Sequence, residues 1–262
     1  ICITLILILS FIIPTETFAE DHLNINAKSA ILMDYNTKEV LYEKNPNEKL
    51  YPASLTKIMT LLLGMEALES GKISLTDEVR ISAHAASMGG SQLWLEEGET
   101  QTVENLFKAI TIRSANDASV ALAEHIAGSE EIFVKMMNEK AKELGMNNTN
   151  FMNSSGLHHE NHYTTAYDVA LMSAELLKYD KIHEWLTVYM DEMLVGKQKD
   201  KVQSLVNTNR LIKEYEGTTG IKTGSTSQAG YCLSASAKKG NLHLIAVVMG
   251  SETSKIRFEE SI

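Results

Sequence analysis

Cysteine, proline and basic side chains are scarce in this sequence of 262 residues. Two Cys and three Pro occur, too few for a disulfide framework or for a proline-rich linker that would divide the chain. Lys and Arg total 24 against 34 Asp and Glu, which gives a net charge of -10. This acidic balance lacks the electrostatic footprint of a protein that binds nucleic acid or an anionic membrane surface, so we expect neither partner. The remaining composition, 44% hydrophobic and 22% charged, is typical of a globular domain and excludes disorder and a multi-span membrane protein.

Long apolar runs are also absent, apart from one at the start of the chain. Residues 1–13 are almost wholly apolar, Pro14 breaks the run, and residues 17–19 resemble a signal-peptidase site. As a helix this run would rise about 20 Å, which is less than a hydrocarbon core of roughly 30 Å. We interpret residues 1–19 as a secretory signal peptide that lacks its own beginning, and residues 20–262 as the exported chain. Cys232 then remains alone, in an apolar run that predicts a buried, inert thiol.

Strand-like segments lie at both ends of the exported chain, and helical periodicity lies between them. Residues 29–34 and 39–43 flank a short polar turn, and residues 230–237 and 242–249 flank another, so each pair predicts a β-hairpin. Apolar residues recur at helical spacing in five segments: residues 55–69, 102–110, 117–127, 130–144 and 166–178. Strands from both chain ends are most economically paired in one antiparallel sheet, which predicts an α+β fold with a helical insert. Two acidic residues at positions 130–131 are expected to lie either in a solvated turn or in the first turn of a helix.

The chemistry concentrates at three short motifs, of which the first is Ser54-Leu-Thr-Lys57. It opens a predicted helix, so the two polar side chains, three residues apart, share one face. A serine hydroxyl needs a neighbouring base to act as a nucleophile, and the positive end of a helix lowers a lysine pKa. Chance alone produces such pairs, and a second S-x-x-K, Ser236 to Lys239, falls in the C-terminal hairpin. The first motif therefore gains meaning only in combination with the others.

The second and third motifs supply groups that can assist such a pair. Ser114-Ala-Asn116 precedes another helix and offers a hydroxyl that can relay a proton and a carboxamide that can hold a substrate amide; the alternative is an N-cap cluster. The run Lys222-Thr-Gly-Ser225 lies just before a predicted strand. On an edge strand it could bind a carboxylate and leave backbone N–H groups free to bond an extended peptide.

In this order, S-x-x-K, S-x-N and K-T-G resemble the signature of penicillin-binding proteins and class A β-lactamases. From about Asn24 to its end, the chain resembles the D-alanyl-D-alanine carboxypeptidases, the low-molecular-mass penicillin-binding proteins. Four segments carry this resemblance: residues 53–60, 114–119, 207–211 and 220–224. It implies a serine β-lactamase/transpeptidase fold, with a five-stranded antiparallel sheet flanked by helices and a helical subdomain inserted at about residues 76–200. The site would lie where the two parts meet.

The resemblance also implies a catalytic function for three residues. Ser54 would attack the carbonyl of the penultimate D-Ala of a peptidoglycan stem peptide, and Lys57 would take its proton. Ser114 would pass a proton to the departing amine, and water would then release the acyl-enzyme. β-Lactams are expected to acylate Ser54 because they mimic the D-Ala-D-Ala end. No metal or organic cofactor is implied.

The remaining matches are implied to bind the substrate. Asn116 would hold the substrate amide, Thr223 would hold the terminal carboxylate, and Lys222 would keep the site electropositive. The N–H groups of Ser54 and Ser225 would form the oxyanion hole, and Gly224 of the K-T-G motif would belong to the same substrate-binding set. Arg257 matches a family arginine near that carboxylate.

The resemblance places the protein in the bacterial cell envelope, at the outer face of the cytoplasmic membrane or in the periplasm or wall space. Members of the family usually continue a C-terminal helix and then add a small β-rich domain and an amphipathic membrane anchor. Residues 255–262 look like the start of that helix. We therefore expect membrane association only through a C-terminal segment that this sequence does not contain.

Four alternatives stay open from the sequence. Glu143 to Asn147 is a near match to the E-x-x-L-N of class A β-lactamases, although Gly145 favours a helix end there. A transpeptidase, in which an amine replaces water, shares all three motifs. Residues 158–162, His-His-Glu-Asn-His, could hold zinc in a peptidase, but they follow Ser-Ser-Gly and are expected to form a loop. A non-catalytic cell-wall binding module would lack part of the nucleophile and lysine set, which is complete here.

Overall fold

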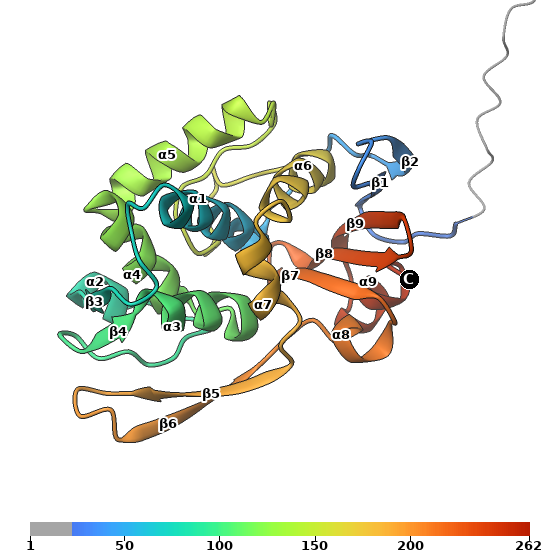
Figure 1. The fold of residues 1–262 in the computed structure, drawn as a ribbon. Coiled ribbons are helices and arrows are strands. Elements are labelled where there is room, and N and C mark those ends of the chain that lie inside the picture. Colours follow the sequence, from blue (N-terminus) through green and yellow to red (C-terminus); the bar gives the residue numbers. More distant parts are fainter. Residues whose placement is uncertain (1–22) are drawn as a thin grey trace, which may run out of the picture.

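The computed structural model describes residues 23–262 (Figure 1), so the predicted signal peptide lies outside the described residues. Its centre is an antiparallel sheet with the strand order β2-β1-β9-β8-β7. The five strands are β1 (Ser29–Asp34), β2 (Val40–Lys44), β7 (Thr218–Thr226), β8 (Gly230–Lys239) and β9 (Leu242–Ser251). Both predicted hairpins are confirmed, and β1 pairs with β9, so the two chain ends share one sheet as expected. The K-T-G motif lies on β7, at the edge of this sheet.

Most of the helices lie between β2 and β7 in the chain (Figure 1). The longer ones are α1 (Lys57–Glu69), α3 (Val103–Lys108), α4 (Asn116–Ala127), α5 (Glu130–Glu143) and α6 (Ala166–Leu176). Short turns complete the set: η1 (Ala53–Thr56), α2 (Ala83–Ala86), η2 (Ala109–Arg113), η3 (Asp180–Ile182), α7 (His183–Leu186), α8 (Leu211–Glu214) and α9 (Ser254–Glu259). All five predicted helices are present. The segment predicted at residues 102–110 is α3, which is continued by the π-helical turn η2.

Side-chain caps explain where several helices begin. Thr165 accepts a hydrogen bond from the backbone N–H of Asp168 at 3.1 Å, and Ser129 accepts one from Ile132 at 3.2 Å. Each satisfies an N–H group that the helix itself leaves unpaired. Gly128 ends α4 in the left-handed conformation, with φ +84.

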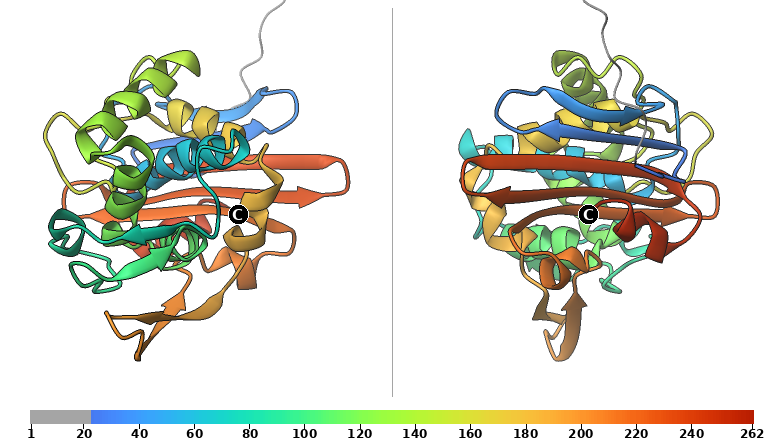
Figure 2. Two further views of the ribbon diagram at one scale, coloured as in Figure 1. Left: turned by 60° about the vertical axis from the view of Figure 1, so that its left-hand side comes forward. Right: turned by 90° about the vertical axis from the view of Figure 1, so that its right-hand side faces the viewer.

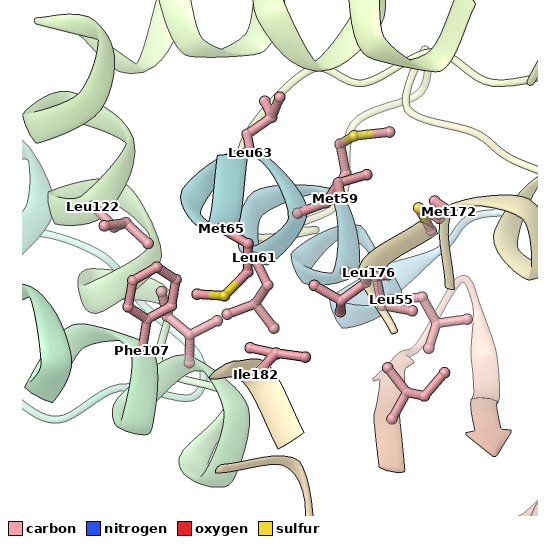
Figure 3. Packing of buried hydrophobic residues seen from close by; sticks show 14 of the residues in the cluster. Leu55, Met59, Leu61, Leu63, Met65, Phe107, Leu122, Met172, Leu176 and Ile182 are labelled. Atoms are coloured by element: carbon pink, nitrogen blue, oxygen red, sulfur yellow. The ribbon is translucent and has the colours of Figure 1, made fainter. Parts of the chain in front are cut away.

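Helix α1 is the centre of the hydrophobic core, and ten of its 13 residues are buried. Figure 3 shows Leu61 and Met65 of α1 near Phe107 of α3 and Leu122 of α4. Gly64 permits a close approach, because a Cβ there would lie 2.8 Å from the Phe107 ring. Since α1 begins at Lys57, this packing holds the first motif rigidly.

The sheet is covered on both faces (Figure 2). Helices α1 and α6 pack on one face, and α9 packs against β8 and β9 on the other. A small separate cluster of Leu211, Leu233, Ala235 and Phe258 fills the second face. Cys232 is fully buried, as predicted, and burial raises the pKa of its thiol to about 11.

Two small two-stranded sheets were not predicted. They are β3 (Glu78–Arg80) with β4 (Thr100–Thr102), and β5 (Met190–Val195) with β6 (Lys201–Val206). The first is too short to show a period, and β5 mixes acidic and apolar residues on both faces. Within residues 23–262, no helix combines the length and apolarity that crossing a bilayer requires.

Candidate active site

The first motif forms a tight turn at the start of α1. Ser54 lies in η1, and Lys57 is the first residue of α1. The Lys57 ammonium Nζ lies 3.1 Å from the Ser54 hydroxyl oxygen. Ala53 has φ +48, which directs the chain sharply into the helix. The predicted nucleophile and base are therefore in hydrogen-bond contact.

Lys57 is completely buried and has three acceptors. Besides Ser54, its Nζ contacts the side-chain oxygen of Asn116 at 2.7 Å and the carbonyl oxygen of Ser155 at 2.5 Å. Burial lowers the pKa of Lys57 well below its usual value, and the positive charge of Lys222 lowers it further. A lysine in this environment can supply a neutral amine that accepts the serine proton.

The second motif lies where η2 passes into α4. Ser114 adopts a left-handed conformation with φ +63, and its buried hydroxyl has no hydrogen-bond partner among residues 23–262. Asn116 uses both ends of its carboxamide, because its nitrogen donates to the Gly89 carbonyl at 2.7 Å while its oxygen faces Lys57. The unpaired Ser114 hydroxyl is thus free to bond a substrate atom.

The third motif lines the site from the sheet edge. Lys222 is buried, its Nζ donates to the Thr223 carbonyl at 3.1 Å, and burial followed by the charge of Arg257 lowers its pKa to about 7. The Thr223 hydroxyl is bonded to that of Thr208 at 2.5 Å. Ser225, two residues farther along β7, is exposed.

Gly224 is where β7 meets the nucleophile turn. A Cβ at this position would lie 2.9 Å from the carbonyl oxygen of Pro52 and 2.9 Å from the backbone nitrogen of Ser54. Only a residue without a side chain allows the strand and the turn to approach this closely. The absence of a side chain at Gly224 therefore sets the distance between the first and third motifs.

Arg257 lies behind β7 rather than in front of it. Its guanidinium donates to the carbonyl oxygens of Gly224 at 3.1 Å and Cys232 at 3.2 Å, and to the hydroxyl of Ser254 at 3.2 Å. Burial lowers its pKa to about 10. These contacts indicate that Arg257 holds β7 in position and contributes positive charge next to Lys222.

Three further residues of the site were missed by the sequence analysis. Ser155 supplies the carbonyl that Lys57 contacts, and Asn153 fixes this loop by accepting hydrogen bonds from the backbone N–H groups of Ser155 and Gly156. Asp117 is buried beneath the site. An Asn-x-x-Gly pattern signals a tight turn, but nothing local indicates which residue the turn contacts.

Asp117 organises the loop that precedes the second motif. Its carboxylate accepts hydrogen bonds from the backbone N–H groups of Leu93 at 2.9 Å and Leu95 at 3.1 Å. Burial raises its pKa, although these hydrogen bonds oppose the shift. The same loop supplies the Gly89 carbonyl to Asn116, so Asp117 supports that side chain indirectly.

Glu130 lies in the first turn of α5, which is one of the two expected positions, whereas the solvated turn is not what the structure shows. Only 15% of its side chain is exposed. One oxygen accepts from the N–H of Ser154 at 2.9 Å and from its hydroxyl at 2.6 Å, and the other contacts His84 at 2.8 Å. Burial raises its pKa, but the bonds from Ser154 and His84 outweigh this and lower it overall. Glu130 thus holds the residue next to Ser155.

Among the described residues, no side chain of the alternative motifs contacts Ser54 or Lys57. The exposed carboxylate of Glu143 ends α5 and pairs with Lys140 at 2.5 Å, as a helix terminus would. Ser236 of the second S-x-x-K is bonded to His243 within the sheet. His162 is buried and bonded to Thr56 at 2.9 Å. In the part of the chain that the structure describes, no three His, Cys, Asp or Glu side chains converge as metal ligands.

Comparisons with known proteins agree with this geometry. A family model described as D-alanyl-D-alanine carboxypeptidase matches residues 15–253. The D-alanyl-D-alanine carboxypeptidase DacF of Bacillus subtilis is 59% identical over 231 residues, which cover 88% of this chain and 59% of that protein. The chain thus spans less than two thirds of the length of this curated relative.

Two solved structures share the fold. The D-alanyl-D-alanine carboxypeptidase DacD from Francisella tularensis has a TM-score of 0.87 and 32% identity, covering 90% of this chain and 68% of that one. Penicillin-binding protein D2 from Listeria monocytogenes, in its ampicillin-bound form, has a TM-score of 0.80 and 30% identity, covering 91% of this chain and 95% of that one. The predicted sheet with flanking helices is confirmed.

Proposed function

Because this chain belongs to the D-alanyl-D-alanine carboxypeptidase family, we propose that it is a serine-type carboxypeptidase that removes the terminal D-Ala from peptidoglycan stem peptides. The observation that carries the proposal is the contact of 3.1 Å between Lys57 Nζ and Ser54 Oγ, inside a site where burial lowers the lysine pKa. A nucleophile needs such a base, and an unactivated serine would not react.

The proposed acylation forms the bond between Ser54 Oγ and the penultimate carbonyl carbon. Lys57 takes the hydroxyl proton as this bond forms. The negative charge on the carbonyl oxygen is stabilised by the backbone N–H groups of Ser54 and Ser225. The peptide C–N bond then breaks, and Ser114, whose hydroxyl has no protein partner within residues 23–262, delivers a proton to the departing D-Ala nitrogen. Ser114 regains a proton from Lys57, which returns to the neutral amine before deacylation.

Deacylation uses water as the acceptor. Lys57 takes a proton from water while the water oxygen bonds to the ester carbon, and Ser54 Oγ leaves with a proton. The shortened peptide departs as a carboxylic acid. The side-chain oxygen of Asn116 lies 2.7 Å from Lys57 Nζ, so Asn116 is suited to hold both the lysine and the substrate amide.

Positive charge at the sheet edge supports recognition of the terminal carboxylate. Lys222 is buried, and its pKa of about 7 responds to the nearby Arg257. The whole chain carries a net charge of -10, so attraction for an anionic substrate must be local. We assign the carboxylate to Thr223 and Lys222, with Arg257 acting from behind the strand.

β-Lactams are proposed covalent inhibitors that acylate Ser54. The relative from Listeria monocytogenes with the same fold is described in an ampicillin-bound form, which supports this extension. We further propose that residues 20–262 form one catalytic domain with a helical subdomain at about residues 76–200, exported to the cell envelope by the signal at residues 1–19.

The test is release of D-Ala from diacetyl-L-Lys-D-Ala-D-Ala, measured with and without penicillin. Ser54→Ala is expected to abolish both D-Ala release and covalent labelling by a fluorescent penicillin. Ser236→Ala is a matched control, because Ser236 belongs to the S-x-x-K pattern that lies in the sheet. Labelling that survives in Ser54→Ala, or penicillin turnover without an accumulating acyl-enzyme, would contradict the proposal.

A further inference from the structure

The proposed substrate defines a direction along β7. Its terminal carboxylate is assigned to Thr223, and its attacked carbonyl to the N–H of Ser225. An extended peptide advances about 3.3 Å with each residue. Because the terminal carboxylate lies at Thr223 and the attacked carbonyl at Ser225, the rest of the peptide must continue past Ser225 toward Thr226. Beyond Thr226 the chain turns, and Gln228 lies in that turn before β8 begins.

A hollow of about 270 Å³ opens at this end of the strand. Its lining includes Lys28, Lys49, Tyr51, Glu160, Tyr163 and Gln228. Tyr51 also lines a smaller hollow of about 10 Å³ together with Ala53 and Thr226. Tyr51 therefore lines both the larger hollow and the smaller one beside the nucleophile turn, so the larger hollow lies next to that turn.

The walls of this hollow are held by the fold. Leu50 and Thr164 exchange two backbone hydrogen bonds, at 2.8 and 2.9 Å, which fix the segments that carry Lys49 and Tyr163. The Lys49 ammonium lies 4.7 Å from the centre of the Tyr163 ring. On the opposite side, the stem of Lys28 packs on Gly250, where a Cβ would lie 2.9 Å from it.

The charges of the hollow do not cancel. Neither Lys28 nor Lys49 makes an ion pair within residues 23–262, although the chain has 34 acidic residues against 24 basic ones. The lining contains two ammonium groups and one carboxylate, Glu160. Tyr51, Tyr163 and Gln228 add groups that can donate hydrogen bonds to an anion. This combination suits a carboxylate on an extended ligand.

We propose that this hollow, the Lys28–Lys49 pocket, binds a carboxylate that the stem peptide carries before its acylated alanine. The inference rests on the proposed function, since that function gives the peptide its direction. Two positions could supply the group: the side chain of the residue directly before the alanine, or the α-carboxylate of a γ-linked D-glutamate one residue earlier. Both present the same chemistry to the lysines.

The test compares acid and amide forms of one peptide. Four peptides ending in D-Ala-D-Ala would be used, as two acid–amide pairs. In one pair the α-carboxylate of the γ-linked D-glutamate is free or amidated. In the other pair the side-chain carboxylate of a meso-diaminopimelic acid, placed directly before the alanine, is free or amidated. Affinity for the Ser54→Ala protein is measured by calorimetry, and D-Ala release is measured with the unaltered protein. We expect the acid form at one of the two positions to bind about three- to tenfold more tightly than its amide.

Charge variants test whether the pocket causes this preference. Lys49→Met and Lys28→Met keep the apolar stems, and together they are expected to reduce the acid-to-amide ratio to about one. Glu160→Gln removes the opposing carboxylate and is expected to increase the ratio. Lys72→Met is the matched control, because Lys72 is exposed beyond the far end of α1 and its loss changes the net charge equally; it should leave the ratio unchanged.

The outcomes separate the two proposals. Equal affinity for acid and amide forms at both positions, or a preference that the double lysine variant retains, overturns the pocket even if D-Ala is released. Absence of D-Ala release from all four peptides and from diacetyl-L-Lys-D-Ala-D-Ala overturns the proposed function, while a lysine-dependent acid preference in binding would still support an anion site at the pocket.

Discussion

The Nζ of Lys57 lies 2.5 Å from the carbonyl oxygen of Ser155, closer than the 3.1 Å that separates it from the hydroxyl of Ser54. The proposed base is therefore held by a loop 98 residues away in sequence. That loop is itself held, because the neighbouring Ser154 donates two hydrogen bonds to Glu130 and its carbonyl accepts one from Thr60 at 2.6 Å. The position of the base thus depends on α5 as well as on its own helix.

The first prediction concerns Glu130. Glu130→Ala removes the carboxylate oxygen that accepts both hydrogen bonds from Ser154 and leaves a buried N–H and hydroxyl unpaired, which should lower the free energy of unfolding by about 1–3 kcal/mol. It should also slow acylation, because the Ser155 carbonyl would no longer be fixed beside Lys57. Urea unfolding and the rate of fluorescent-penicillin labelling measure the two effects.

His84→Ala is the control for this prediction. It removes the ion partner of Glu130 but keeps both bonds to Ser154, and half of the His84 side chain is exposed. A pair in which one partner is half-exposed to water contributes little, about 0–1 kcal/mol, so labelling should keep its normal rate. If His84→Ala slowed labelling as much as Glu130→Ala, the ion pair rather than the loop contact would be responsible.

The second prediction concerns the contact between β7 and the nucleophile turn. Gly224→Ala places a Cβ 2.9 Å from backbone atoms of Pro52 and Ser54, and backbone cannot move aside as a flexible side chain can. Overpacking of this kind costs about 1–3 kcal/mol of stability, and we expect labelling of Ser54 to fall at least about 100-fold because the turn is displaced. Gly240→Ala, in an exposed turn with open space around it and φ +59, should cost stability without slowing labelling.

Local sequence signals predicted the main elements well. Thr165 marks the start of α6 because its hydroxyl caps that helix, and strand-like composition on either side of a short polar turn predicted the two hairpins of the main sheet. The hairpin of β5 and β6 was not predicted from the sequence because its outer face carries exposed apolar side chains, Met190, Leu194 and Val202. Its composition therefore lacks the polar-out alternation that identifies a half-buried strand.

The site shows a different limit. Motif spacing and resemblance placed Ser54, Lys57 and Asn116, which the fold brings into contact. Ser155 and Glu130 could not be found in this way, because their importance comes from a carbonyl and a carboxylate that reach across the fold. A single sequence records residue types, whereas these two contacts depend on the packing of α5 and its following loop on α1.

The third prediction concerns the pH dependence of substrate binding. Lys222 is buried with a pKa of about 7, so in the free protein its positive charge is present below that pH and is lost above it. The KM for a peptide with a terminal carboxylate should therefore rise as the pH increases through about 7, with a smaller change in kcat. Lys222→Arg keeps its charge throughout this range and should move the rise to a higher pH; an unmoved profile would assign the titration to another group.

The fourth prediction concerns acid stability and starts from His162. Burial, and then the charges of His159 and His158, lower the pKa of His162 to about 3, from an ordinary value of 6.5. Since the unfolded chain binds the proton more readily, stability from neutral His162 is complete above pH 6.5 and is lost as the pH falls from 6.5 toward 3.

His162→Gln should be less stable at pH 7, because its packing and its bond to Thr56 are altered, but its unfolding midpoint in urea should fall less steeply between pH 7 and pH 5. His125→Gln, at a partly exposed position, should retain the steep slope of the unaltered protein. Equal slopes for His162→Gln and the unaltered protein would show that another group causes the loss of stability in acid.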